Sequence, residues 1–395
     1  MTGHTGPPPD PVEVAIIGAG PVGLYLATHL AQAGVRVAVL EARRAPARHS
    51  RAIGLHPPGL AALAEVGAAE PLAARGVAIV RGRAYGALGP AGPRPLGVLS
   101  LDAVLPAPFP YVLSVPQRVT EEVLAARLCA AAPAALRRGV RVTDVRRGAS
   151  GVTLSTEAVD GVAPPDPLHA RVAVACDGGR GQSAAWLGVP VRGGRYRDHY
   201  LMADVPDDGV LGDDAAIFLA RDGVVESFPL PAGRRRWVAR TDRPPAEADP
   251  NQLARMVAER TGVHLTVRGA VHTSAFGTER RLATRLAEGQ LWLCGDAAHV
   301  VSPIGGQGMN LGLLGAARAA RGVRAALRGE LDWAEAERAY DHRQRAAARR
   351  AARRAAWNMR LGRPTPVPWA REAAVRGLLR SPTARWAARL FTMQA

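Results

Sequence analysis

The 395-residue sequence contains no lysine, and all 51 of its basic residues are arginine. Without a lysine amine, catalysis through a Schiff base is excluded. The chain is also rich in alanine, glycine and proline, so the arginine bias is more typical of a GC-rich genome than of a surface selected to bind polyanions. The formal net charge is +17, but no helix-turn-helix, zinc-ligand spacing or RNA-binding aromatic motif accompanies it. We therefore expect no nucleic-acid partner.

Cysteine is scarce, and long uncharged hydrophobic runs are missing. Cys129, Cys176 and Cys294 are far apart in the sequence and form no CxxC motif, which argues against a disulfide framework, a zinc site and a dithiol oxidoreductase. The N-terminal segment is polar and proline-rich rather than a signal peptide, and no apolar run of about 18 residues follows it. We expect a globular protein of the cytoplasm, with no metal site and no membrane insertion.

Glycine, in contrast, is plentiful, and its first cluster has an informative spacing. A β-branched run leads into Gly18-x-Gly20-x-x-Gly23, and a helical pattern and a second predicted strand follow. In a dinucleotide-binding βαβ unit, Gly18 permits the tight turn, Gly20 lets the backbone approach a pyrophosphate, and Gly23 lets the helix pack on the strand. Glu41, at the end of the second strand, is placed to hydrogen-bond an adenosine ribose. The motif alone does not distinguish NAD from FAD.

A second glycine-rich stretch, LCGDAAHVVSPIGGQGMNLG, begins at Leu293. Glycine loses the most backbone freedom on folding, so a cluster of it marks a place where the backbone comes very close to another group.

With these two motifs and the segments HSRAIGLHPPGLAALAEVG, SVPQRVTEEVLAARL and ACDGG, the sequence from Val14 to about Arg345 resembles the class A FAD-dependent aromatic hydroxylases. This is the p-hydroxybenzoate hydroxylase type, and the similarity is greatest to its actinomycete polyketide hydroxylases. The resemblance implies non-covalent FAD as cofactor and NAD(P)H as transient reductant. It places Arg51 near the flavin pyrophosphate, and Gln117 and Asp177 beside the cofactor.

In the second motif, Asp296 is placed to accept a hydrogen bond from a ribityl hydroxyl of FAD. Pro303 and Gly306 would lie against the isoalloxazine ring, and a helix beginning near Gly308 would direct amides toward the place where charge gathers on reduction. The complete set of predicted cofactor-binding residues is Gly18, Gly20, Gly23, Glu41, Ala42, Arg43, Arg51, Gln117, Asp177, Asp296, Pro303, Gly306, Gly308, Met309 and Asn310.

The resemblance also implies an α/β fold. A Rossmann-like FAD-binding domain of the p-hydroxybenzoate hydroxylase and glutathione-reductase type would carry an inserted β-sheet substrate domain and C-terminal helices. We predict the FAD-binding domain at 1–76, 107–190 and 277–345, the substrate domain at 77–106 and 191–276, and a C-terminal helical segment at 346–395. Some polyketide hydroxylases add a C-terminal thioredoxin-like domain, which we do not expect in this sequence.

The activity that the resemblance implies is hydroxylation of an aromatic or polyketide-derived small molecule in secondary metabolism, through a C4a-hydroperoxyflavin.

One segment departs from the family pattern. After the Asp177-Gly178 pair the family has a serine and then an arginine, where this chain has Gly181 and Ala184. The use of NAD(P)H in its usual geometry therefore stays open, as does the alternative of an FAD-dependent oxidase, dehydrogenase or epoxidase of the same fold.

No catalytic residue can be assigned from the sequence. Candidate substrate contacts are Arg83, Tyr85, Tyr196 and Phe228, although aromatic residues at strand spacing are more often core residues; Tyr111, Tyr200, Phe218 and Trp237 have the same pattern. A lone histidine on an apolar stretch, His299, is interpreted as a hydrogen-bonded core residue. We interpret the arginine-rich segment HRQRAAARRAARRAAWNM as a solvated helical face. The chain is expected to be a monomer or a homodimer.

Overall fold

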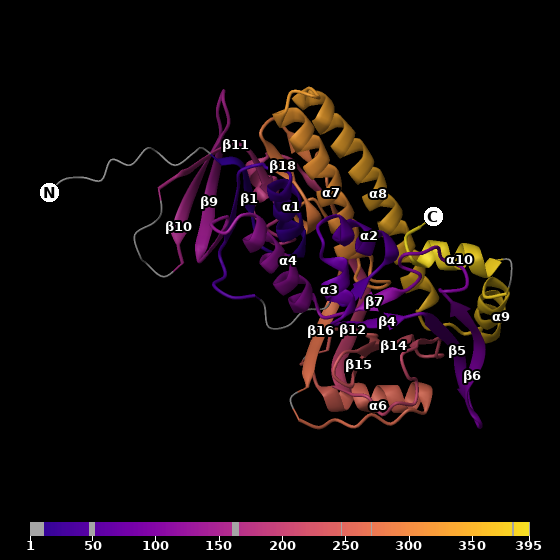
Figure 1. Ribbon diagram of the computed structural model, residues 1–395. Helices are drawn as coiled ribbons and strands as arrows, with labels where there is room; N and C mark the ends of the chain where they lie inside the picture. Colours follow the sequence, from indigo (N-terminus) through magenta and orange to yellow (C-terminus); the bar gives the residue numbers. More distant parts are fainter. Residues whose placement is uncertain are drawn as a thin grey trace.

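Parallel strands form the centre of the first sheet (Figure 1). The computed structural model describes residues 12–46, 52–159, 166–245, 247–269, 271–380 and 383–394. The parallel strands follow in the order β18 (Leu291–Leu293), β11 (Leu168–Ala175), β1 (Val12–Ile17), β2 (Val37–Glu41) and β8 (Leu136–Arg138). The apolar runs of β1, β2 and β11 are buried along most of their length, as expected for central parallel strands. Antiparallel strands extend this sheet: β17 (Ala287–Glu288) beside β18, and the hairpin of β9 (Val140–Arg147) and β10 (Val152–Ala158) beside β11.

Helices cover the first sheet. α1 (Pro21–Gln32) connects β1 to β2 and packs against α4 (Gln117–Ala131) and α7 (Gln307–Leu327), and α8 (Trp333–Leu361) packs on α7. The βαβ unit predicted from the first glycine motif is therefore present. The short helices of this region are α2 (Pro57–Glu65), α3 (Ala69–Ala73) and α5 (Ser183–Trp186).

The second sheet is mostly antiparallel and lies below the first in Figure 1. Its strands follow in the order β19 (His299–Val300), β16 (His272–Ala283), β12 (Val191–Pro206), β15 (Arg234–Thr241), β14 (Val225–Leu230), β13 (Ala215–Phe218), β5 (Arg81–Gly89) and β6 (Gly92–Ser100). α6 (Pro250–Thr261) covers one face, and Asp249 caps this helix by accepting hydrogen bonds from the amides of Asn251 and Gln252.

Smaller elements connect the two sheets. β3 (Gly54–Leu55), β7 (Val112–Ser114) and β4 (Val77–Ile79) form a third sheet that contacts both α7 and β14. α9 (Pro368–Leu378) packs on β5 and β6, and α10 (Thr383–Phe391) packs on α9. β16 crosses the predicted domain boundary at 276–277, so the division of the chain into domains stays a prediction.

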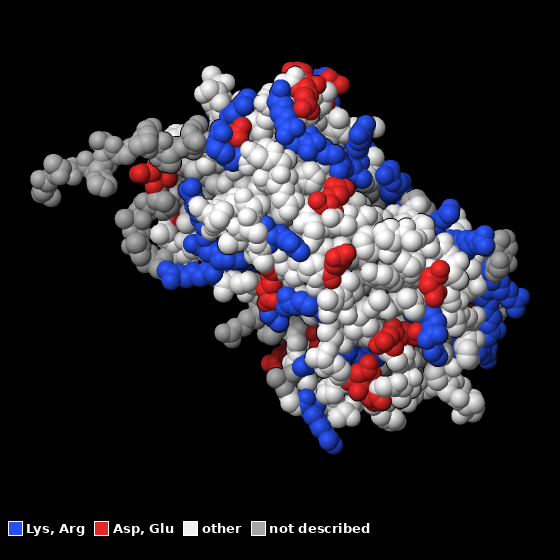
Figure 2. All heavy atoms as spheres, viewed as in Figure 1, with Lys and Arg blue, Asp and Glu red and all other residues white. Residues whose placement is uncertain are grey.

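Arginine side chains are distributed over much of the face shown in Figure 2, where acidic residues separate many of them. The middle of this face is largely uncharged. Within the described ranges, no helix combines the length and the apolar character that crossing a membrane requires.

Candidate functional site

A cavity of about 1080 Å³ lies between the first and second sheets. On one side it is lined by the N-terminus of α1, the ends of β11 and β18, and the loop that precedes α7. On the other side lie one face of the second sheet and residues of α8, α9 and α10. Both glycine motifs identified in the sequence therefore reach the same space.

The three glycines of the first motif have different surroundings. Gly18 has φ +102°, and a Cβ atom there would lie 2.6 Å from the carbonyl oxygen of Cys176. A Cβ atom at Gly23 would lie 2.1 Å from the carbonyl oxygen of Gly18. These two glycines are thus required for the packing of the turn. Gly20 lines the cavity, and no protein atom lies within 4 Å of its Cβ position, so the space at the positive N-terminus of α1 is open.

Glu41, at the end of β2, packs against this turn and is not among the residues that line the cavity. One of its carboxylate oxygens accepts a hydrogen bond from the amide of Ala19 at 2.7 Å, and the other accepts from the amide and Nε of Arg43 at 2.9 and 3.0 Å. Burial acts to raise the pKa of Glu41, but these hydrogen bonds outweigh it and hold the pKa below its usual value. Glu41 is therefore an anchored carboxylate, followed by the half-buried Ala42. Arg51 lies outside the described residues.

The second glycine motif folds into the cavity wall. Gly295–Ala297 form a single 3-10 turn after β18, and Asp296 faces the cavity. Although Asp296 is exposed to the cavity, desolvation by the surrounding wall raises its pKa to about 6, against the lowering effect of Arg281. The loop that follows contains Pro303 and Gly306, the latter in the left-handed region with φ +64°, and α7 begins at the next residue. Gly308 and Met309, in the first turn of α7, also line the cavity.

Asn310 does not line the cavity but fixes the loop that does. Its side-chain oxygen accepts a hydrogen bond from the amide of His56 at 2.9 Å, and its Nδ2 donates to the carbonyls of Gly54 at 2.9 Å and Gly306 at 2.8 Å. The side chain is completely buried. Asn310 thus joins the N-terminus of α7 to β3 and the start of α2.

We expect Asn310→Ala to lower the free energy of unfolding by about 2 to 3 kcal/mol, because it leaves several buried backbone groups unpaired. Urea unfolding of the cofactor-free protein measures this change. A change below about 0.5 kcal/mol would contradict the anchoring role.

The departure from the family pattern at Gly181 has a structural reason in this chain. A Cβ atom at Gly181 would lie 1.9 Å from Oδ2 of Asp177, so no larger side chain fits while the carboxylate stays in place. Oδ2 also accepts a hydrogen bond from the amide of Ser183 at 3.3 Å, and Oδ1 is buried without a partner. Burial raises the pKa of Asp177. The neighbouring Arg180, rather than Asp177, lines the cavity.

The residues of this half of the cavity fit FAD. The open space at Gly20 can accept a pyrophosphate, and the Asp296 carboxylate can accept hydrogen bonds from hydroxyl groups. Gln307 is 1 % exposed, and its Oε1 has no hydrogen-bond partner. A buried acceptor without a partner, beside a cavity, indicates a missing donor. Gln117, at the start of α4, lies in the same wall, where its Nε2 donates to Glu121 at 2.8 Å.

Two cysteines that are far apart in the sequence meet in this wall. Cys176 and Cys294 directly follow the paired ends of β11 and β18, where Ala175 lies opposite Leu293. Their thiols are hydrogen-bonded, and this bond together with burial raises the pKa of Cys176. Sequence spacing did not indicate the contact, because the parallel pairing of two distant strands creates it.

Successive side chains of a strand point to opposite faces of a sheet, so the predicted substrate residues of the second sheet fall on two different faces. Tyr85 stacks on Phe218 with ring centroids 4.8 Å apart, and Phe218 on Trp237 at 6.0 Å. All three belong to the core cluster that includes Leu253 and Val257 of α6, on the face away from the cavity. These aromatic residues therefore pack as core, the alternative that the sequence favoured for aromatics at this spacing.

The remaining candidate substrate residues differ in whether they line the cavity. Phe228 lines the cavity, and so does Arg83, whose Nε is paired with Asp214 at 2.5 Å. Tyr196 packs against the cluster that contains Tyr200 and does not line the cavity. Tyr111 packs edge-on against Phe109 in the first core. The roles of all these residues as substrate contacts stay predictions.

Sequence reasoning missed Glu226, which lines the substrate half of the cavity. Its neighbours across the sheet are Ile217 on β13 and Val238 on β15, both apolar and both in the cavity wall. In the described part of the chain, no hydrogen bond or ion pair reaches its carboxyl group. Burial raises its pKa to about 7. The only sequence signal was one acid within the apolar strand VESFPL.

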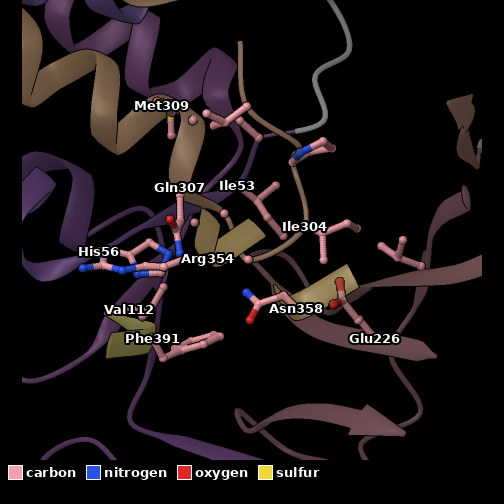
Figure 3. A pocket seen from close by; sticks show the side chains of 18 of the residues that line it. Ile53, His56, Val112, Glu226, Ile304, Gln307, Met309, Arg354, Asn358 and Phe391 are labelled. Carbon is pink, nitrogen blue, oxygen red and sulfur yellow. The ribbon is translucent and has the colours of Figure 1, made fainter. Parts of the chain in front are cut away.

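Figure 3 shows Glu226 at one end of the cavity, with His56, Gln307 and Arg354 at the other and Asn358 between them. His56 is 2 % exposed, and burial lowers its pKa to about 4, so the ring is neutral. The C-terminal helices complete the wall with apolar side chains, among them Leu379, Trp386 and Phe391. Among the described residues, Glu226 is thus an unpaired carboxyl group in the wall of the substrate half, beside the apolar side chains of Ile217 and Val238.

Comparisons with known proteins agree with this geometry. Residues 11–355 match the family model described as FAD binding domain. The chain is 33% identical over 312 residues to rifampicin monooxygenase of Streptomyces venezuelae, with 76% of this chain and 61% of that protein covered. It is 32% identical over 323 residues to the 12-dehydrotetracycline 5-monooxygenase/anhydrotetracycline 6-monooxygenase of Streptomyces rimosus, with 76% and 60% covered.

The chain thus spans about three fifths of the length of these curated relatives. Among solved structures, p-nitrophenol 4-monooxygenase PnpA from Pseudomonas putida DLL-E4 has the same fold. Its TM-score is 0.87 at 22% identity, and the match covers 98% of both chains.

Proposed function

The chain belongs to the FAD binding domain family, and from that membership we propose that it is an FAD-dependent monooxygenase. Its substrate would be an aromatic or polyketide-derived small molecule, and NAD(P)H would be the reductant. The observation that carries this proposal is the continuous cavity. It joins both glycine motifs to an apolar face of a second sheet, so a flavin and a ring substrate can occupy one space.

We further propose that the predicted cofactor residues hold FAD as the sequence indicates. Gly20 would face the pyrophosphate, Asp296 would accept from the ribityl chain, and the amides at the N-terminus of α7 would face the ring. When bound, FAD supplies the chemistry that activates O₂ for transfer to carbon. The predicted division into a discontinuous FAD-binding domain and an inserted substrate domain is kept, with the separate core clusters of the two sheets as its support.

The chain's own contribution is to orient the substrate and to exclude water. Trp386 and Phe391 of α10 cover the cavity together with Leu379. Met202, Ile217 and Val238 form an apolar floor on the second sheet. An aromatic ring between these two walls is held by apolar contacts, which require no specific hydrogen bonds.

We propose Glu226 as the group that takes a proton from, or donates a hydrogen bond to, an oxygen of the substrate. Its carboxyl group faces the cavity and has no protein partner in the described chain, so a phenolic hydroxyl can reach it. A pKa of about 7 suits a general acid or base at neutral pH. Removal of the phenol proton makes the ring more electron-rich and thus more reactive toward an electrophilic oxygen.

The first test of the function loads the protein with FAD and supplies NADPH, ¹⁸O₂ and a panel of phenolic polyketides. We expect one labelled oxygen atom in the product of an accepted substrate. An oxidase or dehydrogenase, the second candidate, would produce labelled hydrogen peroxide or no oxygen chemistry, and its product would carry no label. A protein that cannot be loaded with FAD would contradict both.

A further inference from the structure

A hollow of about 430 Å³ lies beside the main cavity, between α8 and the paired strands β12 and β16. No acidic residue of the described chain lines it. Its wall contains six arginines, Arg192 and Arg280 and Arg281 from the two strands, and Arg345, Arg349 and Arg353 from α8.

Most of these arginines lack an acidic partner. Arg281 pairs with Glu279 at 3.1 Å, and Arg345 pairs with Asp341 at 3.1 Å. Within the described ranges, the other four form no ion pair. In addition, the Nε atoms of Arg281 and Arg345 are buried without a hydrogen-bond partner. Like charges gathered around one hollow repel each other, so a bound anion would stabilise the arrangement.

The three arginines of α8 are spaced by four residues, which places them on one face of the helix. This face belongs to the arginine-rich segment that the sequence favoured as a solvated surface. In the structure these three positions also line the hollow, and Arg349 and Arg353 are at the same time exposed to solvent. Arg343 of the same helix is exposed too, but it does not line the hollow.

A second observation comes from His299, which lines the hollow and is 2 % exposed. The side-chain oxygen of Gln344 accepts a hydrogen bond from Arg318. The Nε2 of Gln344 therefore donates, and it lies 2.7 Å from Nε2 of His299. Nε2 of the histidine is therefore the acceptor. Burial lowers the pKa of His299 to about 4, so the ring is neutral and its proton is on Nδ1.

This Nδ1 has no hydrogen-bond partner in the described chain. His299 is thus buried and hydrogen-bonded, as predicted, but it also presents an unpaired donor in the wall of the hollow. A buried donor beside unpaired guanidinium groups fits a ligand with several anionic oxygens.

The hollow also adjoins the main cavity. Arg281, Val300, Val301 and Arg353 line both. The two valines directly precede the loop with Pro303, which we propose to flank the flavin ring. A ligand held in the hollow by its anionic end therefore lies beside the flavin half of the main cavity.

We propose that the hollow binds the phosphate groups of NADPH, and that it favours NADPH over NADH. This inference rests on the proposed function and locates its reductant. One guanidinium group can donate two parallel hydrogen bonds to the oxygens of a phosphate. Among the residues described, the hollow has four arginines without an acidic partner, which is more than one pyrophosphate requires. The remaining positive charge can therefore bind the 2′-phosphate. The site does not use the Asp-Gly segment in which Gly181 and Ala184 depart from the family pattern.

The test measures binding of 2′,5′-ADP, 5′-ADP and NADP⁺ to the FAD-loaded protein by calorimetry. The variants are Arg280→Glu and Arg349→Glu, with Arg343→Glu as the matched control on α8. We expect 2′,5′-ADP to bind the parent about tenfold more tightly than 5′-ADP does. Each substitution in the hollow should lower the affinity for 2′,5′-ADP by about tenfold or more. The control is expected to change binding by less than twofold.

The FAD content and melting temperature of each variant show whether it is folded and loaded, and Arg280→Gln and Arg349→Gln replace any charge reversal that fails to fold. Unchanged binding of 2′,5′-ADP in both hollow variants would overturn the inference. The inference would also be overturned if the variants weakened only the binding of a carboxylate-bearing phenol, because the hollow would then bind an anionic substrate. If NADPH still bleaches the flavin with unchanged affinity in these variants, the inference fails while the proposed function stands. A protein that binds no FAD contradicts the function itself.

Discussion

Replacement of Gly20 by leucine is expected to abolish FAD binding and to leave the fold intact. The Cβ position of Gly20 has no protein atom within 4 Å, and its φ of −74° is allowed for any residue. The protein alone therefore has room for the side chain. The same space lies at the N-terminus of α1, where the pyrophosphate is proposed to bind, so a leucine would occupy it.

We expect FAD affinity to fall by about 100-fold or more, which corresponds to about 2.7 kcal/mol of binding free energy. The melting temperature of the cofactor-free protein should stay within about 2 °C of the parent's. Flavin fluorescence measures the first quantity and circular dichroism the second.

Gly23→Ala provides the contrasting control. Its methyl group would lie 2.1 Å from the carbonyl oxygen of Gly18, a backbone atom that cannot move without displacing the turn. We expect the free energy of unfolding of the cofactor-free protein to fall by about 3 kcal/mol. If Gly20→Leu bound FAD normally, or if it destabilised the protein as much as Gly23→Ala does, the distinction between an open glycine and a packing glycine would be wrong.

The glycine motifs could be interpreted from the sequence because their physics is local. The strand and the helix on either side of the first motif have their own apolar patterns, and Gly23 packs against Gly18, five residues earlier. Only the contact of Gly18 with Cys176 joins distant parts of the chain. Spacing alone therefore predicted a βαβ unit. In the turn from Gly295 into α7 the glycine spacing is also visible in the sequence, but Gly295 and Gly306 pack against the distant residues Val22 and His56.

The substrate half could not be predicted in the same way, because it depends on which distant strands pair and in which register. Glu226 faces the cavity only because Ile217 and Val238 are its cross-strand neighbours. A shift of one residue would move it to the α6 face. Tyr85 is predicted from the sequence to contact the substrate but lies on the opposite face, in the core. An aromatic residue on a strand has no intrinsic preference between the two faces, so the sequence could not decide this.

The arginine-rich helix shows a third limit. A four-residue spacing predicts that Arg345, Arg349 and Arg353 share a face of α8, but the sequence does not say what that face meets. The partner strands lie more than 60 residues earlier in the chain, with Arg280 and Arg281 on β16. Charge clusters of this kind become visible only when the tertiary arrangement is known.

Glu226→Gln is expected to remove the pH dependence of the reaction near neutrality. In the parent, the carboxyl group loses its proton at a pKa of about 7. If the carboxylate accepts the proton of a phenol, kcat/KM of the parent should rise as the pH increases through 7. The glutamine variant should show a flat profile and a value about 100-fold lower at pH 8, the usual effect of losing one general base. Glu226→Asp, which keeps the carboxyl group, should retain the pH-dependent step.

Stability provides an independent measure of the same group. The folded-state pKa is raised above the ordinary value of 4.5, so between about pH 4.5 and 7 the folded protein holds a proton that the unfolded chain has lost. The free energy of unfolding of the parent should therefore decrease as the pH rises through this window. Glutamine cannot ionise, so the variant should be more stable than the parent by up to about 3 kcal/mol at pH 8 and equal to it near pH 4. Urea unfolding at both pH values measures the difference. A flat activity profile without this stability change would mean that the pKa of Glu226 is not raised in the folded protein without substrate. A stability change with an unaltered activity profile would mean that the titrating base is another residue and that Glu226 takes no proton from the substrate.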